Sequence, residues 1–310
     1  MNSCKIIMYH YVRPIKQSSY PEIKGLEIEG FLRQIEFFKK NFHFITAEEL
    51  LDCIYEQKQI PEKSVWLTFD DGFKDHYTHV FPILKKYQIQ GSFFPPAKPI
   101  EENIVLDVHK IHFILASISN KQEIINEIFN LINQFKDEYN LKKSETYYEN
   151  LAIANRFDTK EVVFIKRILQ RDLPKQAKEI FTNQLFEKFV TTDEKSFSKE
   201  LYLSFEEIQE MKESGMFFGS HGYAHEWLTY LSEHDLTHEI QKSLDFIHKI
   251  NMSFNNLIMC YPYGNNDLQI ISKLKKEGFK AGLTTEVDDA ILDPSHSLSL
   301  PRYDTNDFPQ

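Results

Sequence analysis

Two patterns of hydrophobic and polar positions alternate along the first and last thirds of the chain. Short runs of β-branched and aromatic residues are typical of buried strands. Longer segments with apolar side chains every three or four residues are typical of helices that bury one face. The predicted strands are 5–12, 64–69, the GSFF segment before Pro95, 216–220, 256–261 and 281–284; the predicted helices are 28–41, one opening at Thr46, 76–87, 204–214, 232–250 and 267–277.

Two of these helix starts carry a capping box. Thr46 precedes Glu49, and Ser204 precedes Glu207, by the spacing at which a hydroxyl and a carboxylate satisfy two orphaned backbone N–H groups. The helices are therefore expected to begin directly after Thr46 and Ser204.

The middle of the chain has a different pattern. Almost all signals from about residue 101 to residue 199 are helical, as in QEIINEIFNLINQF. The flanking alternation of strands and helices indicates an α/β fold with largely parallel pairing. We therefore predict a barrel formed by residues 1–100 and 200–310, interrupted by a helical insertion at 101–199.

Composition narrows the functional class. The formal net charge of -10 disfavours nucleic-acid binding, because affinity for phosphate backbones comes mostly from lysine and arginine. The three cysteines are scattered and form no C-x-x-C pair, so they are expected to be reduced thiols. No signal peptide or membrane-spanning stretch is apparent, and a cytoplasmic location is expected.

The first candidate site is T-F-D-D-G, residues 68–72, at the end of an apolar run. Functional groups in parallel α/β folds gather at the carboxyl ends of strands. Two adjacent carboxylates repel each other, so binding a cation to one leaves the other available as a base. The alternative is a turn that simply ends a strand.

The second candidate site is H-G-Y-A-H, with His221 and His225. A helix would put both imidazoles on one face, and a tight loop could also bring them together. Two surface histidines are the alternative. Together with one of the aspartates they supply two nitrogens and an oxygen, a set that suits one divalent ion, with zinc expected and cobalt, nickel or iron as alternatives.

The third candidate site is Y-P-Y-G, residues 261–264, which closes another predicted strand. A backbone N–H exposed by this turn could stabilise the oxyanion of a tetrahedral intermediate. The alternative is a Pro-Gly turn with aromatic packing.

These three motifs, in this order, resemble the polysaccharide deacetylases of carbohydrate esterase family 4. The resemblance covers about residues 5–95 and 200–305 and leaves the helical insertion unmatched. It implies a distorted (β/α)7 barrel in which Asp70 is the general base. Asp71, His221 and His225 would bind the metal.

Two departures from the family pattern concern the third motif and the acid. Cys260 and Tyr261 stand where an arginine and a proline are usual, and the C-terminal motif with the acid histidine is absent. Members acting on poly-N-acetylglucosamine have a circularly permuted order with this histidine on the first strand, which implies His10. Two alternatives remain: His10 could have a core role, or His296 could be the acid. Arg302 is a candidate to replace the arginine that is usual at the position of Cys260.

The resemblance implies hydrolysis of an N-acetyl group on an amino sugar of a bacterial surface glycan or its precursor. Water activated by the metal would attack the carbonyl while Asp70 accepts its proton and His10 protonates the leaving amine. The metal and the N–H of Tyr263 would stabilise the oxyanion. The aromatic residues Tyr223, Trp227, Tyr261 and Tyr263 flank this site, and Trp227 is the favoured sugar contact.

Other functions remain open at this point. The chain could hydrolyse another amide, such as a formamido sugar or a cyclic imide, or it could be a silent glycan-binding scaffold. The sugar could be a polymer, lipid-linked or a nucleotide sugar. The helical insertion could cover the barrel mouth or form a homodimer interface.

Overall fold

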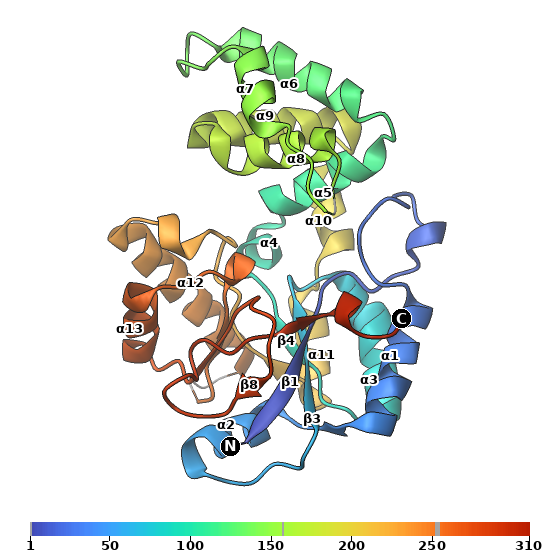
Figure 1. The fold of residues 1–310 in the computed structure, drawn as a ribbon, viewed down its shortest axis with the longest axis vertical. Helices are drawn as coiled ribbons and strands as arrows, with labels where there is room; N and C mark the ends of the chain where they lie inside the picture. Colours follow the sequence, from blue (N-terminus) through green and yellow to red (C-terminus); the bar gives the residue numbers. More distant parts are fainter. Residues whose placement is uncertain (1, 157, 252–254) are drawn as a thin grey trace. The chain divides into compact units, whose positions relative to one another are not determined.

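The computed structural model describes residues 2–156, 158–251 and 255–310, and Figure 1 labels many of its elements. The chain divides into two compact units. The first consists of Met1–Arg13, Gly25–Asn103 and Ser198–Gln310, and the second of Pro14–Lys24 and Ile104–Phe197. All strands that the structure describes belong to the first unit.

Parallel strands form the centre of the first unit. Strand β1 (Ser3–Tyr9) pairs with β3 (Ser64–Asp70), β3 with β4 (Ser92–Phe94), and β4 with β5 (Phe217–Phe218). The short β2 (His43–Phe44) pairs with the start of β3. Each longer connection contains a helix, as parallel pairing requires.

Further parallel pairings close the sheet into a distorted barrel. Ser220, just after β5, bridges to Met259 in β6 (Ile258–Cys260), and β6 pairs with β7 (Ala281–Leu283). Leu283 bridges to Leu300, and β9 (Tyr303–Asp304) returns to pair with β1. Parallel pairings thus continue around the interior and return to β1, in agreement with the expected distorted barrel. The short β8 (Ala290–Ile291) is antiparallel to β1.

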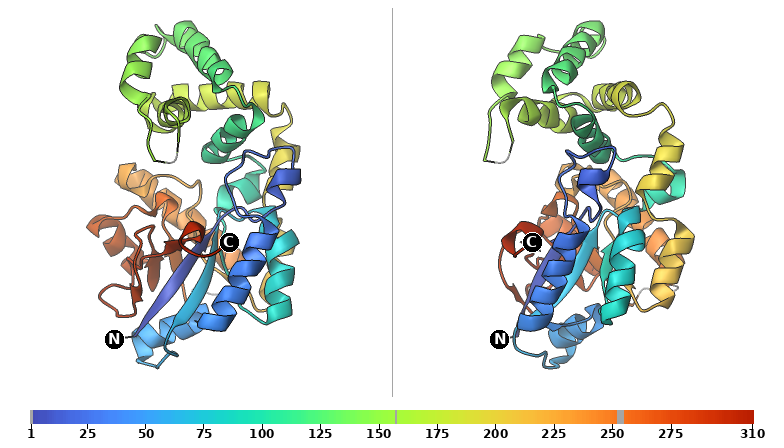
Figure 2. Two further views of the ribbon diagram at one scale, coloured as in Figure 1. Left: turned by 45° about the vertical axis from the view of Figure 1, so that its right-hand side comes forward. Right: turned by 90° about the vertical axis from the view of Figure 1, so that its right-hand side faces the viewer.

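Alternating strand residues face two different cores. One cluster includes residues of helix α2 (Ala47–Glu56) together with the strand residues Ile6, Trp66, Phe94 and Cys260. The strand residues that alternate with them belong to a second cluster, which packs against the outer helices. Two of these helices, α1 and α3, lie along the sheet in Figure 2. Side chains point to opposite faces at successive positions of a strand, so even-numbered residues of β1, β3 and β6 face the barrel interior.

The helices covering the first unit follow the predicted positions closely, except for α4, which was not predicted. They are α1 (Ile28–Asn41), α2, α3 (Phe81–Tyr87), α4 (Ala97–Glu102), α11 (Phe205–Glu213), α12 (Glu233–Asn251) and α13 (Leu268–Lys276). Both predicted capping boxes are present, at Thr46 and Ser204. The expected helix at 76–87 begins with a π-helical turn, His76–Val80. The first strand ends at Tyr9, short of the predicted Val12, which bridges instead to Leu26.

The regular secondary structure of the second unit is helical in its described residues. Its helices are α5 (Asp107–Ser117), α6 (Lys121–Phe135), α7 (Ser144–Leu151), α8 (Lys160–Arg167), a π-helical segment (Ile168–Asp172), α9 (Lys175–Phe189) and the start of α10 (Glu194–Leu201). Both α5 and α6 pack on α9. The buried residues Ile128, Phe164, Phe181 and Leu185 contribute to its interior.

No described helix is long and apolar enough to cross a lipid bilayer.

Candidate active site

The predicted chemical groups meet at one end of the barrel. His10 follows β1, Asp70 ends β3, and His221 lies just beyond β5. Tyr261 follows β6, and Thr284 follows β7. Since these strands are parallel, their carboxyl ends lie on the same face, as the sequence predicted.

Asp71, His221 and His225 form a compact donor set. The Nε2 atoms of His221 and His225 each lie 3.4 Å from Asp71 Oδ1, and all three side chains are buried. Two ligand atoms bound about 2.1 Å from a tetrahedral ion would be about 3.4 Å apart. Two imidazole nitrogens and a carboxylate oxygen also suit zinc and its neighbours in the periodic table. The donor set therefore fits a divalent metal ion.

Unusual backbone conformations position two members of this set. Asp71 has φ 71° and His225 has φ 56°, in the left-handed region that L-residues adopt rarely. Gly72 also has a positive φ of 61°, and a Cβ there would approach Pro95 Cβ to 2.6 Å. Such conformations persist where the surroundings enforce them, and they cluster at functional sites. The H-x-x-x-H segment is thus a tight loop, the second of the two arrangements considered from the sequence.

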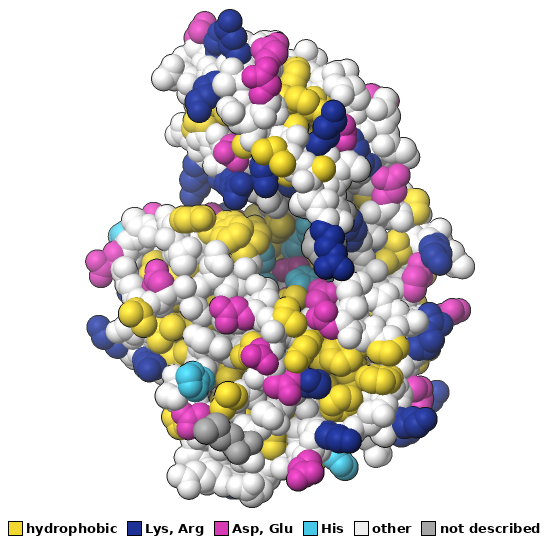
Figure 3. Space-filling view, in the orientation of Figure 1, with side chains coloured by type: hydrophobic (Ala, Val, Ile, Leu, Met, Phe, Trp, Pro, Cys, Tyr) yellow, Lys and Arg dark blue, Asp and Glu magenta, His cyan; other side chains and the backbone are white. Residues whose placement is uncertain are grey.

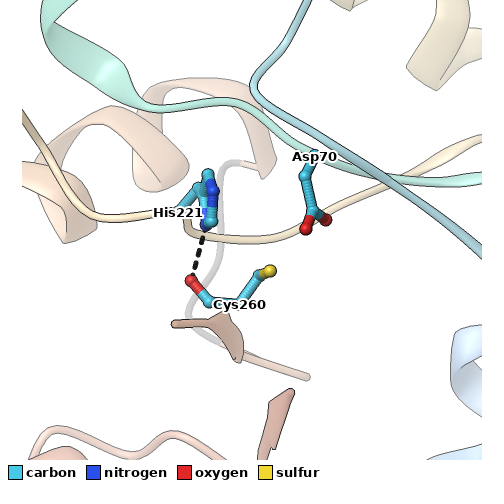
Figure 4. Close-up of side chains that lie close together, drawn as sticks. All are labelled: Asp70, His221 and Cys260. Carbon is cyan, nitrogen blue, oxygen red and sulfur yellow. Dashed lines mark hydrogen bonds between the residues drawn. The ribbon is translucent and has the colours of Figure 1, made fainter. Parts of the chain in front are cut away.

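Cys260 fixes the orientation of the first histidine. His221 Nδ1 lies 2.7 Å from the backbone carbonyl oxygen of Cys260, which can only accept a hydrogen bond (Figure 4). Nδ1 must therefore carry the proton, which leaves the Nε2 lone pair to bind the metal. Asp70, His221 and the Cys260 thiol also lie close together, but both oxygens of Asp70 are already engaged. This second cluster shares His221 with the first donor set, and Arg302 already contacts its carboxylate, so the first set is the better candidate for a metal site.

Arg302 holds Asp70 through a hydrogen bond and an ion pair. Its Nη1 lies 2.9 Å from Oδ1 of Asp70, and its Nη2 lies 2.8 Å from Oδ2. The guanidinium also donates to the Thr284 carbonyl and to Thr68 Oγ1. Burial alone would raise the pKa of Asp70, but attraction to Arg302, with a smaller contribution from His221, lowers it to about 2. Asp70 is therefore an anion with a fixed orientation.

Glu239 of α12 supports the loop that carries His221 and His225. Its Oε1 accepts hydrogen bonds from the backbone N–H groups of Tyr223 (2.8 Å) and Ala224 (2.7 Å), between the two histidines. Burial raises the pKa of this carboxyl. We did not predict Glu239 as a site residue, although a carboxylate on the apolar face of a helix, beside Leu236 and Ile240, was a usable signal.

His10 lies at the edge of the site. Its Nε2 is 3.9 Å from Asp70 Oδ2 and 4.0 Å from Asp71 Oδ2, and 40% of its side chain is exposed. Its backbone carbonyl accepts a hydrogen bond from Nε2 of the buried His76, at 2.9 Å. Burial lowers the pKa of His76 to about 4, so this ring is neutral. His76 anchors the backbone of His10 and leaves the imidazole of His10 accessible.

Tyr263 and Trp227 form an aromatic wall beside the metal set. Tyr263, with φ 60°, has its ring 4.7 Å from the ring of His225 and 4.0 Å from that of Trp227, on which it stacks with an interplanar angle of 5°. Tyr223 donates its hydroxyl to Glu102. Figure 3 shows hydrophobic side chains gathered beside histidine and acidic side chains on one face of the molecule.

Two side chains that were candidates for the site lie away from it. Tyr261 is fully buried, and its hydroxyl donates to the Leu298 carbonyl at 2.9 Å. It follows the inward-facing Cys260, so strand alternation turns Tyr261 toward the outer helices, away from any substrate. His296 is exposed in a turn, and no described hydrogen bond or ion pair joins it to Asp70 or Asp71.

Sequence comparison identifies relatives of the chain. Residues 57–282 match the family described as "Polysaccharide deacetylase". Poly-beta-1,6-N-acetyl-D-glucosamine N-deacetylase of Staphylococcus epidermidis is 34% identical over 105 residues, which cover 30% of this chain and 36% of the relative. The enzyme of the same name from Staphylococcus aureus strain N315 is 35% identical over 105 residues, with the same coverage. The matched segments thus span about a third of these curated relatives.

Solved structures share the fold. The Streptococcus pyogenes deacetylase PplD in complex with acetate aligns with a TM-score of 0.61 and 18% identity, covering 98% of this chain and 92% of that one. IcaB from Ammonifex degensii aligns with a TM-score of 0.54 and 17% identity, covering 97% and 88%. Because these alignments cover nearly the whole chain, they include its helical segment, which we had expected to be unmatched.

The family match extends over most of the sequence and contains Asp70, Asp71, His221 and His225, the residues that the barrel brings together. The chain belongs to the polysaccharide deacetylase family.

Proposed function

We propose that this protein is a metal-dependent hydrolase that removes the N-acetyl group from an amino sugar of a bacterial surface glycan or its precursor. The observation that carries the proposal is the arrangement of two adjacent aspartates in different roles. Asp71 completes a donor set with His221 and His225, while Asp70 is held as an anion by Arg302. A base placed beside a metal site is what the hydrolysis of an amide requires.

Asp71, His221 and His225 would hold the ion, and zinc is the proposed metal because its preferred ligands match this set. When bound, the ion supplies Lewis acidity that polarises the amide carbonyl and makes a nearby water more acidic. Asp70 accepts the proton of the attacking water. Arg302 acts as a positioning residue that keeps the Asp70 carboxylate oriented toward that proton.

The remaining groups complete the reaction. The backbone N–H of Tyr263 is proposed to donate to the oxyanion that develops on the acetamide oxygen. His10, which is accessible and close to both aspartates, is proposed to protonate the leaving amine. Trp227 and Tyr263 present an aromatic wall against which the sugar ring packs.

The organisation of the chain supports the same proposal. We propose that the barrel of residues 1–100 and 200–310 carries the catalytic site and that residues 101–199 are an insertion that does not supply catalytic groups. This division is supported by the location of every proposed catalytic and metal-binding residue within the first unit.

The test combines metal analysis with acetate release from N-acetylated monosaccharides, oligosaccharides and nucleotide sugars, with formamido sugars as a separate arm. We expect about one zinc per chain and acetate release that a chelator abolishes. Formate release without acetate release would assign the enzyme to another acyl group. Metal binding with no product from any substrate would contradict the proposal and favour a glycan-binding barrel.

A further inference from the structure

The polypeptide crosses between the two units at four places, and two of these crossings flank the long helical segment. The outgoing segment, residues 97–103, consists of α4 and the residue that ends it, and the returning segment is residues 198–203. The Ser198 hydroxyl lies 3.5 Å from the carbonyl oxygen of Pro99, so the two segments are neighbours within the first unit. Each segment also contacts one of the loops that carry the proposed metal ligands.

The outgoing segment is bonded to the loop of residues 221–225, here called the histidine loop. At the start of α4, the Ala97 N–H donates to the carbonyl of the glycine in this loop at 3.3 Å. The next N–H, that of Lys98, donates to the Tyr223 carbonyl at 2.9 Å. At the other end of α4, Glu102 accepts a hydrogen bond from the Tyr223 hydroxyl. Both ends of α4 are thus attached to the residues between the two histidines.

The returning segment is bonded to the loop that carries Asp71, here called the aspartate loop. The Leu203 N–H donates to the Gly72 carbonyl at 2.9 Å. Tyr202 forms an antiparallel bridge with Phe73, and their rings are stacked with centroids 6.2 Å apart. Tyr202, Leu203 and Phe73 are buried, so this attachment is shielded from water.

The three proposed metal ligands are therefore divided between two loops, each attached to a different connecting segment. Asp71 belongs to the aspartate loop, and His221 and His225 belong to the histidine loop. The 3.4 Å separations between Asp71 Oδ1 and the two Nε2 atoms depend on how these loops are held relative to each other. Contacts behind a metal ligand keep its orientation, and their loss commonly lowers metal affinity.

We propose that both connecting segments are positioning elements of the metal site, with Glu102 and Tyr223 as the side-chain pair that attaches the outgoing segment. Metal affinity and the rigidity of the two segments are then coupled. Such coupling is reciprocal, so a contact that strengthens metal binding is itself strengthened by the bound metal. This inference rests on the metal site of the proposed function and goes beyond it by giving the junctions of the helical unit a role in metal affinity.

The first experiment measures zinc affinity by competition with a chromophoric chelator. Tyr223→Phe removes only the hydroxyl and should lower the affinity by about threefold to tenfold. Glu102→Ala should lower it by a similar factor, and the double variant should lose no more than either single variant, because both changes break the same contact. Glu102→Gln keeps an acceptor oxygen for the hydroxyl and should recover most of the affinity.

A matched control uses the same pair of residue types elsewhere in the first unit. The Tyr87 hydroxyl donates to Glu36, which joins α3 to α1 rather than to a loop with proposed metal ligands. Tyr87→Phe should therefore leave zinc affinity unchanged. Equal losses in Tyr87→Phe and Tyr223→Phe, or no loss in Tyr223→Phe, would overturn the positioning role.

Amide hydrogen exchange with and without zinc tests the reciprocal effect. Exchange of a bonded N–H requires local opening, so zinc should slow exchange at Lys98 and Leu203 more than within α13. In Tyr223→Phe the slowing should persist at Leu203 and diminish at Lys98. Zinc binding that leaves exchange unchanged at both N–H groups, or slows it equally in α13, would contradict the coupling.

These readouts separate the inference from the proposed activity, because none of them depends on turnover. If zinc slows exchange in both segments and Tyr223→Phe loses affinity while no sugar releases acetate, the positioning role stands and the proposed activity fails. If acetate is released but Tyr223→Phe binds zinc like the wild type, the positioning role fails and the activity stands.

Discussion

Arg302 and Asp70 are separated by 232 positions in the sequence and form a buried ion pair that includes a hydrogen bond from Arg302 Nη1 to Asp70 Oδ1. Family relatives are expected to carry an arginine where this chain has Cys260. In this structure the guanidinium reaches the same carboxylate from the segment that leads into β9. Because β9 pairs with β1 and closes the barrel, the closing segment also delivers the arginine to Asp70.

Replacing Asp70 with asparagine should separate catalysis from metal binding. The amide has nearly the same shape but cannot accept the proton of the attacking water, so kcat should fall by about a hundredfold or more. Zinc content, measured by mass spectrometry, should remain that of the wild type. Asp288→Asn, at an exposed position, is the control and should retain full activity. Near-normal acetate release by Asp70→Asn would show that another group is the base.

Arg302→Lys should reduce kcat more than it changes KM. Lysine keeps the positive charge but loses the planar fork that contacts both oxygens of Asp70, so the carboxylate loses its fixed orientation. We expect kcat to fall by about tenfold to a hundredfold. Arg302→Ala leaves the Asp70 charge buried without its partner and should destabilise the protein by about 3–5 kcal/mol, measured by denaturant unfolding. An unchanged kcat in Arg302→Lys would argue against a positioning role.

Removing a metal ligand should abolish both binding and activity. His221→Ala and His225→Ala each delete one of two nitrogens, and both variants should lose zinc on dialysis. A ligand that binds only the folded state raises stability by about 2.7 kcal/mol at 100 times its dissociation constant. Zinc should therefore raise Tm in the wild type but not in these variants. His296→Ala, at an exposed position, should retain both the metal and the zinc-dependent rise in Tm.

Glu239→Ala should weaken metal binding although Glu239 is not a ligand. It leaves two backbone donors between the histidines without their acceptor, and we expect metal affinity to fall by about tenfold to a hundredfold. Glu239→Gln retains an acceptor oxygen and should recover most of the affinity. The absorption spectrum of the cobalt-substituted protein distinguishes a distorted site from simple destabilisation. An unaltered spectrum and affinity in Glu239→Ala would rule out this positioning role.

Local sequence patterns determined much of the architecture. Runs of apolar residues predicted the positions of β3, β4, β6 and β7. Apolar periodicity predicted α1 with the bounds that the structure shows. Capping boxes fixed the starts of α2 and α11. These signals involve residues within a few positions of one another, so the sequence alone was enough to recognise them. The motifs at strand ends likewise predicted that the two aspartates and the two histidines would meet.

Tertiary structure decided the features that depend on distant residues. The very short β2, β8 and β9 have little periodicity of their own and exist because neighbouring strands supply their hydrogen bonds. The loop form of His221–His225 depends on Glu239, and the burial of Tyr261 depends on the register of β6. The approach of Arg302 to Asp70 requires the barrel to close. The sequence thus determined the identities of the reactive groups, whereas packing between distant segments determined their orientation.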